Sequence, residues 1–569
     1  APLSPIGELW RNTPTQNGVP ADPFAWVLAL LGSLTFWNPS HAVVLLMLVA
    51  VPLASLGGWV WAAQLTESKA GRALAGLGWA LSPVLLGSLG AARLPTLVLA
   101  VTLPWLLLAA SRCRESWSWS GATSLLAAVV LACAPVLIPA ALLLFIIGLV
   151  SSLRGITRVL TTAIAPLVLF APKLVSLIGA PPLDLVIDPG LTPVFRPGTA
   201  WQSMLGFPEF GLAGWGPILD ALGLGDAPAT LLVGVLLLPI VLLAALGLFT
   251  GRILVTMLSA LVGGLGLLTA LASAQLRLIS EGPDAVAVWT GSGLALYWIG
   301  VLSLAAVGCT VLARAATPIV SVAVVAALVA VAPLAVNLVL AKTELRPGSA
   351  QMPAIVQAAG TADPELHTLV LTALGDQSVR AELVTGSGVR LDQLRTADRT
   401  SATTSQDRWV ALLVGALAST GGDEQLRKSL AQHGVGFVLL RSSGDPTERA
   451  SLQASFDQST ALESAGQTDH GLLWRLQGEV SAGSAAPAST AKVLEGTSFS
   501  GRTVWWAQLI VLLGMVLLAL PTGEVVERPE RRRRGSRTPA AAAVGGTSVV
   551  ETPAAETSAA ETSAAETPA

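Results

Sequence analysis

Long apolar runs are the feature that most constrains how this chain folds. Three of them cover residues 41–63, 228–250 and 317–341, and each is longer than the roughly 18 residues that cross a bilayer as a helix. The composition agrees, because 53% of the 569 residues are hydrophobic and only 12% are charged. The sequence therefore predicts an all-α polytopic membrane bundle. The net charge of −2 excludes a generally basic protein that binds nucleic acid.

The cysteines and histidines form no pattern typical of a disulfide framework or a metal site. All three cysteines lie in or beside apolar runs without a CxxC pair, as small buried hydrophobic residues do. The four histidines show no HExxH motif or other ligand spacing. We predict no metal-binding residue and assign no cofactor, and a divalent cation stays open.

An arginine-rich stretch, ERPERRRRGSR at 527–537, follows the last apolar run. Basic residues beside a membrane span stay on the cytoplasmic side and attract anionic lipid heads, so the C-terminus is predicted to be cytoplasmic. Counting back by the same rule gives about eleven transmembrane helices and an extracytoplasmic N-terminus. We therefore expect at least one further span upstream of Ala1.

One stretch, residues 121–151, is ambiguous in this count because Pro135 and Pro139 interrupt it. A single crossing would place Lys69, Arg72, Arg112 and Arg114 outside. A hairpin of two short helices that turns near Pro135 would place those four residues inside, as the positive-inside rule prefers. We predict the hairpin, with its turn buried in protein or lining a cavity.

The sequence divides into five predicted regions. These are an extracytoplasmic segment with an interfacial helix (1–40), a transmembrane bundle with a long outer loop at 180–227 (41–341), an extracytoplasmic α/β domain (342–502), a last transmembrane helix (503–521) and a cytoplasmic tail, first basic and then disordered (522–569). In the interfacial helix, Trp26 and Trp37 are expected at headgroup level.

The small α/β domain is predicted from short apolar and alternating segments. Strands are expected at 367–374, 378–386, 434–441 and 470–477. The amphipathic stretch 408–419 is too short to cross a bilayer and is expected to be a helix, as is the polar stretch before residue 434.

Residues 71–112 contain a GWALSP helix (78–83), a G-x-x-R-L turn (90–94) and a span that ends in LPWLLLA (103–109). This pattern resembles the GT-C type of polytopic glycosyltransferase, such as arabinofuranosyltransferases. More closely, it resembles the membrane-embedded C-terminal half of large actinobacterial proteins that begin with a family 2 glycosyltransferase domain. The segment GELWR (7–11) recurs there as well.

The resemblance implies a glycosyltransferase, or the membrane half of one, in the bacterial plasma membrane. It implies cell-envelope glycan assembly with a polyprenyl-phosphate-linked sugar or a lipid-linked glycan at the outer face, and an upstream family 2 domain as a further partner. Two alternatives stay open: a non-catalytic module that translocates or scaffolds a lipid-linked glycan, and a transporter. Neither the sugar, the linkage, the acceptor nor the oligomeric state follows from the sequence.

Candidate site residues follow from charge and depth, which predict one outer-face cavity bounded by Asp22, Arg93, Lys173 and the 180–227 loop. Inverting sugar transfer needs a carboxylate for the acceptor proton and a cation for the leaving phosphate. The catalytic candidates are Asp22 and Glu8, although Asp22 also fits a helix N-cap. The candidates for substrate binding are Lys173, Arg93, Arg196, Asp184 and Asp188. Lys173 lies inside the predicted span 158–179, where it either meets a phosphate or extends to the outer interface. The sequence alone predicts that Lys173→Met folds normally and loses activity.

Overall fold

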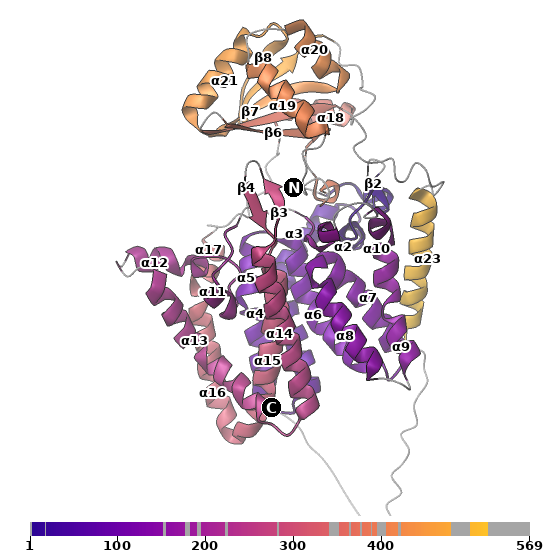
Figure 1. Cartoon of the computed structure of the whole chain (residues 1–569), viewed down its shortest axis with the longest axis vertical. Coiled ribbons are helices and arrows are strands. Elements are labelled where there is room, and N and C mark those ends of the chain that lie inside the picture. The colour runs from indigo at the N-terminus through magenta and orange to yellow at the C-terminus, as the bar shows by residue number, and fades with distance from the viewer. Residues whose placement is uncertain are drawn as a thin grey trace, which may run out of the picture. The chain divides into compact units, whose positions relative to one another are not determined.

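The computed structural model describes most of the first 521 residues (Figure 1). The described residues are 3–16, 19–151, 155–176, 182–190, 195–221, 223, 226–281, 284–340, 352–363, 366–375, 378–388, 390–394, 396, 405–418, 423–478 and 501–521. Residues 1–521 form one compact unit and residues 522–569 a second. The predicted basic stretch and disordered tail lie outside the described residues.

Helices form most of the described chain up to residue 340. They are α1 (Ile6–Arg11), α2 (Phe24–Ser33), α3 (Pro39–Leu65), α4 (Lys69–Ala80), α5 (Pro83–Gly90), α6 (Leu94–Arg112), α7 (Trp117–Cys133), α8 (Ile138–Val150), α9 (Ile156–Thr161), α10 (Ile164–Ser176), α11 (Ala200–Met204), α12 (Trp215–Ala221), α13 (Asp226–Leu248), α14 (Ile253–Gln275), α15 (Gly291–Leu312), α16 (Ala316–Ala330) and α17 (Ala332–Val339). One further apolar helix, α23 (Gly501–Ala519), follows the sheet region.

Six stretches of the described chain are long and apolar enough to cross a membrane, or seven if the bent pair α7 and α8 counts as one span. The stretches are 39–65, 69–90, 94–112, 229–248, 253–275 and 291–330. This supports a multi-pass membrane protein, but the predicted count of about eleven helices is not confirmed. Breaks and short helices account for part of the difference, because the predicted spans 158–179 and 317–341 are each divided into two shorter helices and the apolar helix 503–519 is too short to be counted.

The predicted hairpin at 121–151 is confirmed. α7 and α8 are bent by 118° at the break beside Pro135, where a short 3₁₀ turn covers Pro135–Leu137. The two free ends also return to each other, since the Arg114 guanidinium donates to the Gly148 carbonyl at 3.0 Å and to Ser151 Oγ at 2.7 Å. The turn residues Pro135 to Leu137 are buried, as backbone at membrane depth requires.

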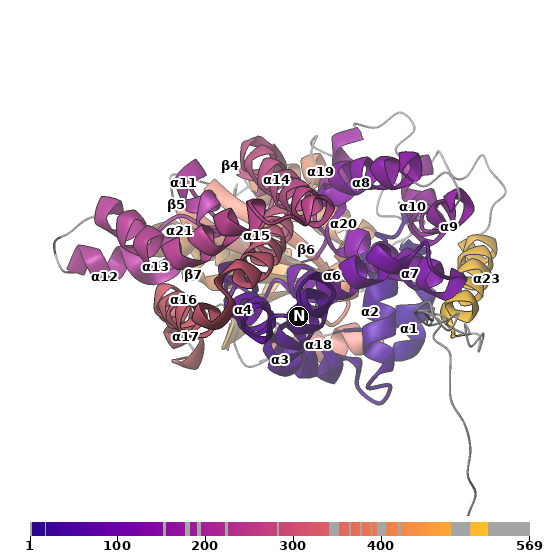
Figure 2. The ribbon, with the colours of Figure 1, turned by 90° about the horizontal axis from the view of Figure 1, so that it is seen from below.

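Glycines let the longest helices pack closely. Figure 2 shows α14 and α15 side by side, with α13 and α4 also beside α15. A Cβ added at Gly266 of α14 would lie 2.2 Å from the Tyr297 amide nitrogen of α15. At Gly308 of α15, a Cβ would lie 2.0 Å from the Leu243 carbonyl oxygen of α13. Small residues at these crossings bring the helix backbones into direct contact, as is common between membrane helices.

Two prolines inside helices leave carbonyls that side chains of other helices satisfy. Pro104 has no N–H for the carbonyl of Ala100 four residues earlier, and Trp79 Nε1 donates to that oxygen at 2.9 Å. In the same way Pro172 frees the carbonyl of Val168, and Gln508 Nε2 of α23 donates to it at 3.1 Å. These bonds fix α4 against α6 and α23 against α10.

A five-stranded sheet lies between residues 367 and 476, in the order β6-β5-β7-β9-β8. Its strands are β5 (His367–Gly375), β6 (Ser378–Thr385), β7 (Val435–Gly444), β8 (Leu462–Thr468) and β9 (Gly471–Leu476), and its helices are α18 (Ala354–Ala362), α19 (Ser405–Ala418), α20 (Asp423–Gln432) and α21 (Pro446–Gln458). β5 and β7 are parallel and the other neighbours antiparallel.

Four of these strands and two helices confirm the sequence prediction, whereas β8, α18 and α21 were not predicted. One sheet face packs against α19, α20 and α21 through residues such as Leu371, Leu440 and Trp474. The other face packs against α18, where Val356 meets Val370 and Phe437. The side of the membrane on which this sheet lies stays a prediction, as do the five region boundaries.

The predicted interfacial helix is shorter than expected, since α2 covers only Phe24–Ser33. Trp26 is buried and meets Trp10 edge-to-face at 5.8 Å, and its placement at headgroup level stays a prediction. Apolar residues occupy both faces of α2. The helix is therefore buried among its neighbours from Phe24 to Ala29. Trp37, just beyond the helix, is 68% exposed.

Candidate functional site

Asp22 and Lys173 meet in a buried ionic contact. Lys173 Nζ lies 2.7 Å from Asp22 Oδ1, although the two residues are 151 positions apart. Thr396 completes the group, since its hydroxyl accepts from Lys173 Nζ at 2.8 Å and donates to Asp22 Oδ1 at 2.8 Å. The Thr396 amide donates to Asp22 Oδ2 at 2.7 Å. Each of the three residues is less than 10% exposed.

Local structure explains where the two charged side chains lie. A short hairpin, β1 (Thr15–Gln16) with β2 (Val19–Pro20), ends two residues before Asp22. Pro23 is the N-cap of α2, without a side-chain capping bond. The interpretation of Asp22 as an N-cap is therefore wrong, because its carboxylate faces Lys173 and Thr396 instead. Lys173 follows Pro172 in the last turn of α10.

Asp22 stays ionised in this setting. Burial raises the pKa of Asp22, but the charge and hydrogen bond of Lys173 and the two bonds from Thr396 together outweigh burial, so the pKa is lowered overall. Lys173 does not extend to an exposed surface, since it is 8% exposed. A pair of opposite charges in contact carries no net charge, and this affects which ligand it suits.

Thr396 belongs to a segment that we call the strap, residues 390–394 and 396. Arg390 Nη1 lies 2.8 Å from Glu8 Oε2 in a half-exposed salt bridge. Asp392 Oδ1 accepts the Ser4 amide at 2.9 Å. Both catalytic candidates, Asp22 and Glu8, are thus in contact with the strap.

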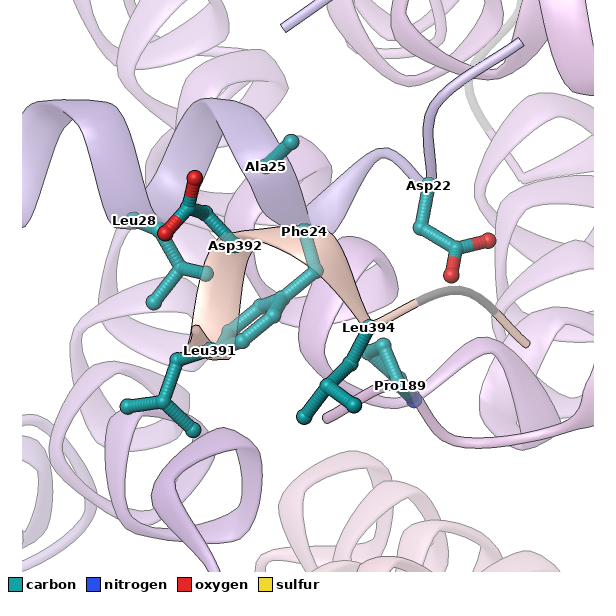
Figure 3. A pocket seen from close by; sticks show the side chains of 8 residues that line it. All are labelled: Asp22, Phe24, Ala25, Leu28, Pro189, Leu391, Asp392 and Leu394. Atoms are coloured by element: carbon teal, nitrogen blue, oxygen red, sulfur yellow. The ribbon is translucent and has the colours of Figure 1, made fainter. Parts of the chain in front are cut away.

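A small pocket lies beside Asp22 (Figure 3). Its lining residues are Asp22, Phe24, Ala25, Leu28, Pro189, Leu391, Asp392 and Leu394. Leu391 and Leu394 come from the strap and Phe24 and Leu28 from α2, so strap and helix together form its apolar wall. The strap therefore covers apolar surface next to the ion pair.

A second buried group lies around Asp188. Ser292, at the start of α15, donates from Oγ to Asp188 Oδ2 at 2.5 Å. The charge of Arg93 acts on the same carboxyl. The Arg93 guanidinium stacks over the Trp289 ring at 3.7 Å from its centroid and lies 5.0 Å from that of Phe195. Arg93 is 3% exposed, so this is a cation held among aromatic rings away from water.

Burial raises the pKa of Asp188 to about 7, even though the bonds from Ser292 and the Val136 amide and the charge of Arg93 each lower it. The carboxyl therefore changes its charge near neutral pH. A buried group that titrates there is typical of functional sites, although structural networks produce such shifts as well.

We expect this carboxyl to make stability fall as pH rises. Unfolded Asp ionises near 3.8 and folded Asp188 near 7, so between these values the unfolded state loses the proton first. The free energy of unfolding should decrease by up to about 4 kcal/mol over this interval. Thermal unfolding of the detergent-solubilised protein at several pH values measures it. Asp188→Asn should lack this decrease, and equal pH slopes for both proteins would contradict the expectation.

The two buried groups are joined by residues 188–190. Asp188 contacts Ser292, and Pro189 lines the pocket beside Asp22. Gly190, at φ +84°, lies so close to Pro95 that an added Cβ would be 3.1 Å from its Cγ. The structure thus pairs Asp22 with Lys173 and Asp188 with Arg93, and the segment 188–190 connects the two groups. The pocket itself is lined by Asp22 but not by Lys173 or Arg93.

The remaining predicted residues are placed differently or not described. Arg196 is exposed, and its guanidinium lies 4.5 Å from the centre of the Phe210 ring. The side chain of Asp184 lies outside the described residues. Sequence reasoning missed Thr396, Arg390 and Ser292. Thr396 stands in a polar stretch, TADRTSATTS, which carries no periodicity that would single it out.

Among the described residues, no group of three or more His, Cys, Asp or Glu side chains could hold a metal ion. Asp22 and Asp188 each face a cation and a hydroxyl rather than another carboxylate. The described site therefore contains carboxylates, cations and hydroxyls.

Comparison with known proteins finds a solved structure with a similar fold but no matching family model or curated sequence. Among solved structures, the arabinofuranosyltransferase AftD from Mycobacteria is similar, with 14% sequence identity and a TM-score of 0.50. The similarity covers 84% of this chain and 39% of the arabinofuranosyltransferase.

The similarity shows the fold. The chain is a multi-pass membrane protein whose fold is similar to that of the arabinofuranosyltransferase AftD. It spans about two fifths of the length of the arabinofuranosyltransferase that it matches.

Proposed function

We propose that this chain is a membrane glycosyltransferase, or the membrane part of one, which acts on a polyprenyl-phosphate-linked sugar at the outer face of the membrane in cell-envelope glycan assembly. The observation that carries the proposal is the buried group of Asp22, Lys173 and a hydroxyl beside the pocket. The fold similarity to an arabinofuranosyltransferase supports it.

The chemistry assigned to Asp22 is that of a general base. As the acceptor oxygen bonds to the anomeric carbon, its proton passes to the Asp22 carboxylate. At the same time the bond between that carbon and the phosphate oxygen breaks, and the phosphate leaves with the electron pair. Asp22 suits this step because it is ionised, and because its Oδ1 already accepts a hydrogen bond from a hydroxyl, that of Thr396, at 2.8 Å.

Arg93 is the residue that we assign to the phosphate. Its guanidinium keeps its charge at all physiological pH values and offers a planar fork that matches phosphate oxygens. The neighbouring Asp188 titrates near neutrality and so neutralises Arg93 only in part. Lys173 is in direct contact with a carboxylate and is better suited to orient the acceptor hydroxyl.

Asp22→Asn tests the proposal. Transfer from a fluorescent polyprenyl-phosphate sugar should be measured in membranes that contain the full chain, with several pentoses and hexoses as donors. Loss of the base should lower the rate by roughly 10²–10⁴-fold. Glu424→Gln, which removes an exposed carboxylate from the Glu424–Arg427 pair on α20, serves as the control and should be fully active. Transfer by Asp22→Asn at the rate of the unaltered chain would contradict the role of Asp22.

A second candidate function is a non-catalytic module that binds or translocates a lipid-linked glycan. One observation favours it: both candidate bases, Asp22 and Glu8, are engaged in ion pairs with Lys173 and Arg390. In that case no donor should support transfer, and the chain should still bind a lipid-linked glycan in a flotation or co-purification assay.

A further inference from the structure

The hydroxyl that contacts Asp22 belongs to Thr396 of the strap. Displacement of the strap would open this position to a ligand. Thr396 presents two donors to one carboxylate, its amide to Oδ2 at 2.7 Å and its hydroxyl to Oδ1 at 2.8 Å. The same hydroxyl accepts from Lys173 Nζ at 2.8 Å. Thr396 thus donates a hydrogen bond to each carboxylate oxygen of Asp22 and accepts one from the ammonium group of Lys173.

Two adjacent hydroxyls of a sugar have the same chemistry. Such a pair offers two donors to the two oxygens of a carboxylate, and either oxygen can accept from an ammonium group. A phosphate fits less well, because the contact between Asp22 and Lys173 leaves no net positive charge and places an anion beside Asp22. The ligand chemistry of this group is therefore that of a neutral vicinal diol.

We propose that Asp22 and Lys173 bind a pair of adjacent sugar hydroxyls, and that the strap, through Thr396, occupies this site as a built-in substitute for the sugar. The inference rests on the proposed function, since it identifies the bound sugar as the acceptor. It adds the class of ligand and a step that precedes binding, which is the release of the strap.

The strap has the features of a removable cover. It is held at its first residues by a half-exposed salt bridge, Arg390 with Glu8, and by the bond from the Ser4 amide to Asp392. An exposed salt bridge of this kind contributes little stability. When the strap leaves, Leu391 and Leu394 leave with it and uncover Phe24 and Leu28 beside Asp22. A sugar with an apolar face or an attached lipid would cover that surface again.

Binding measurements separate this proposal from catalysis. The probes are octyl arabinofuranoside and octyl mannopyranoside, with their 2,3-di-O-methyl derivatives as ligands that lack the diol and octyl phosphate as the anionic ligand. The full chain is held in lipid nanodiscs, which contain no sugar detergent. Binding is measured by isothermal titration calorimetry.

Thr396→Val removes the competing hydroxyl and keeps the side-chain volume, and Arg390→Gln weakens the strap without changing either candidate base. Both proteins should bind at least one octyl glycoside about tenfold more tightly than the unaltered chain, because the ligand no longer displaces a bond to a charged group. The di-O-methyl derivatives and octyl phosphate should show no such gain. Glu424→Gln is the control for a lost surface ion pair.

A cross-link provides the opposite change. Glu8→Cys with Arg390→Cys, joined by a short reducible bis-thiosulfonate linker, should hold the strap closed and abolish glycoside binding until the linker is reduced. The three native cysteines are buried, which favours selective labelling. Unchanged glycoside affinity in the strap variants, or a gain for octyl phosphate alone, would overturn the inference. If glycoside binding tightens but no transfer occurs with any donor, the inference stands and the proposed function fails; transfer with unchanged affinity gives the reverse result.

Discussion

Lys173→Met is expected to destabilise the protein by roughly 3–5 kcal/mol, because it leaves the carboxylate of Asp22 buried without its partner charge. The two side chains are in contact at 2.7 Å, and each is about nine-tenths buried. This changes the expectation from sequence alone, in which the methionine variant folds normally. Glycan transfer should fail as well. Thermal unfolding in detergent measures the first effect, and the transfer assay in membranes measures the second.

The double variant Lys173→Met with Asp22→Asn provides the matched control. It removes both charges, so no uncompensated charge stays buried, and most of the lost stability should return while transfer stays absent. Glu424→Gln removes an exposed ion pair on α20 and should leave unfolding unchanged. If Lys173→Met unfolds at the temperature of the unaltered chain, the contact with Asp22 contributes nothing to stability.

Gly266→Val is expected to separate α14 from α15. The Cβ would lie 2.2 Å from the Tyr297 nitrogen and 2.7 Å from the Gly293 oxygen, and both are backbone atoms that cannot move aside alone. We expect a loss of about 3 kcal/mol or more, as for an overpacked core. Thermal unfolding of the detergent-solubilised chain measures the loss.

Gly264→Val is the control, because it makes the same change in the same helix at a position where a Cβ meets nothing within 4 Å. Both variants alter helix propensity equally, so their difference isolates the contact between helices. Equal unfolding temperatures for the two variants would show that α14 and α15 do not pack through Gly266.

Interactions within a short stretch of chain could be predicted. Pro135 was expected to break the helix at 121–151 because proline lacks an amide hydrogen, and the break is there. The alternating apolar residues of 367–374 and 378–386 predicted two strands that do pair. Length alone was less reliable: 158–179 and 317–341 are long enough to cross, but each contains a break.

The candidate site shows the limit of such reasoning. Charge and expected depth placed Asp22, Lys173, Arg93 and the 180–227 loop, which contains Asp188, around one cavity at the outer face. Their pairing was not predicted, nor was the choice of Asp188 rather than Asp22 as the carboxyl whose pKa lies near 7. That value depends on how many atoms surround the carboxyl and which donors reach it, and no local pattern encodes either.

The sequence by itself determined a multi-pass helical membrane protein with a small sheet region, because the length of an apolar run and its periodicity act over one helix or strand. Only the tertiary structure decided that Lys173 pairs with Asp22 across 151 positions and that the Thr396 amide reaches Asp22 across 374. Contacts at such separations depend on how distant parts of the chain pack, and α10, which carries Lys173, is held by the bond from Gln508 of α23 to the Val168 carbonyl that Pro172 frees. A buried charge must find a partner, but the sequence does not say which one.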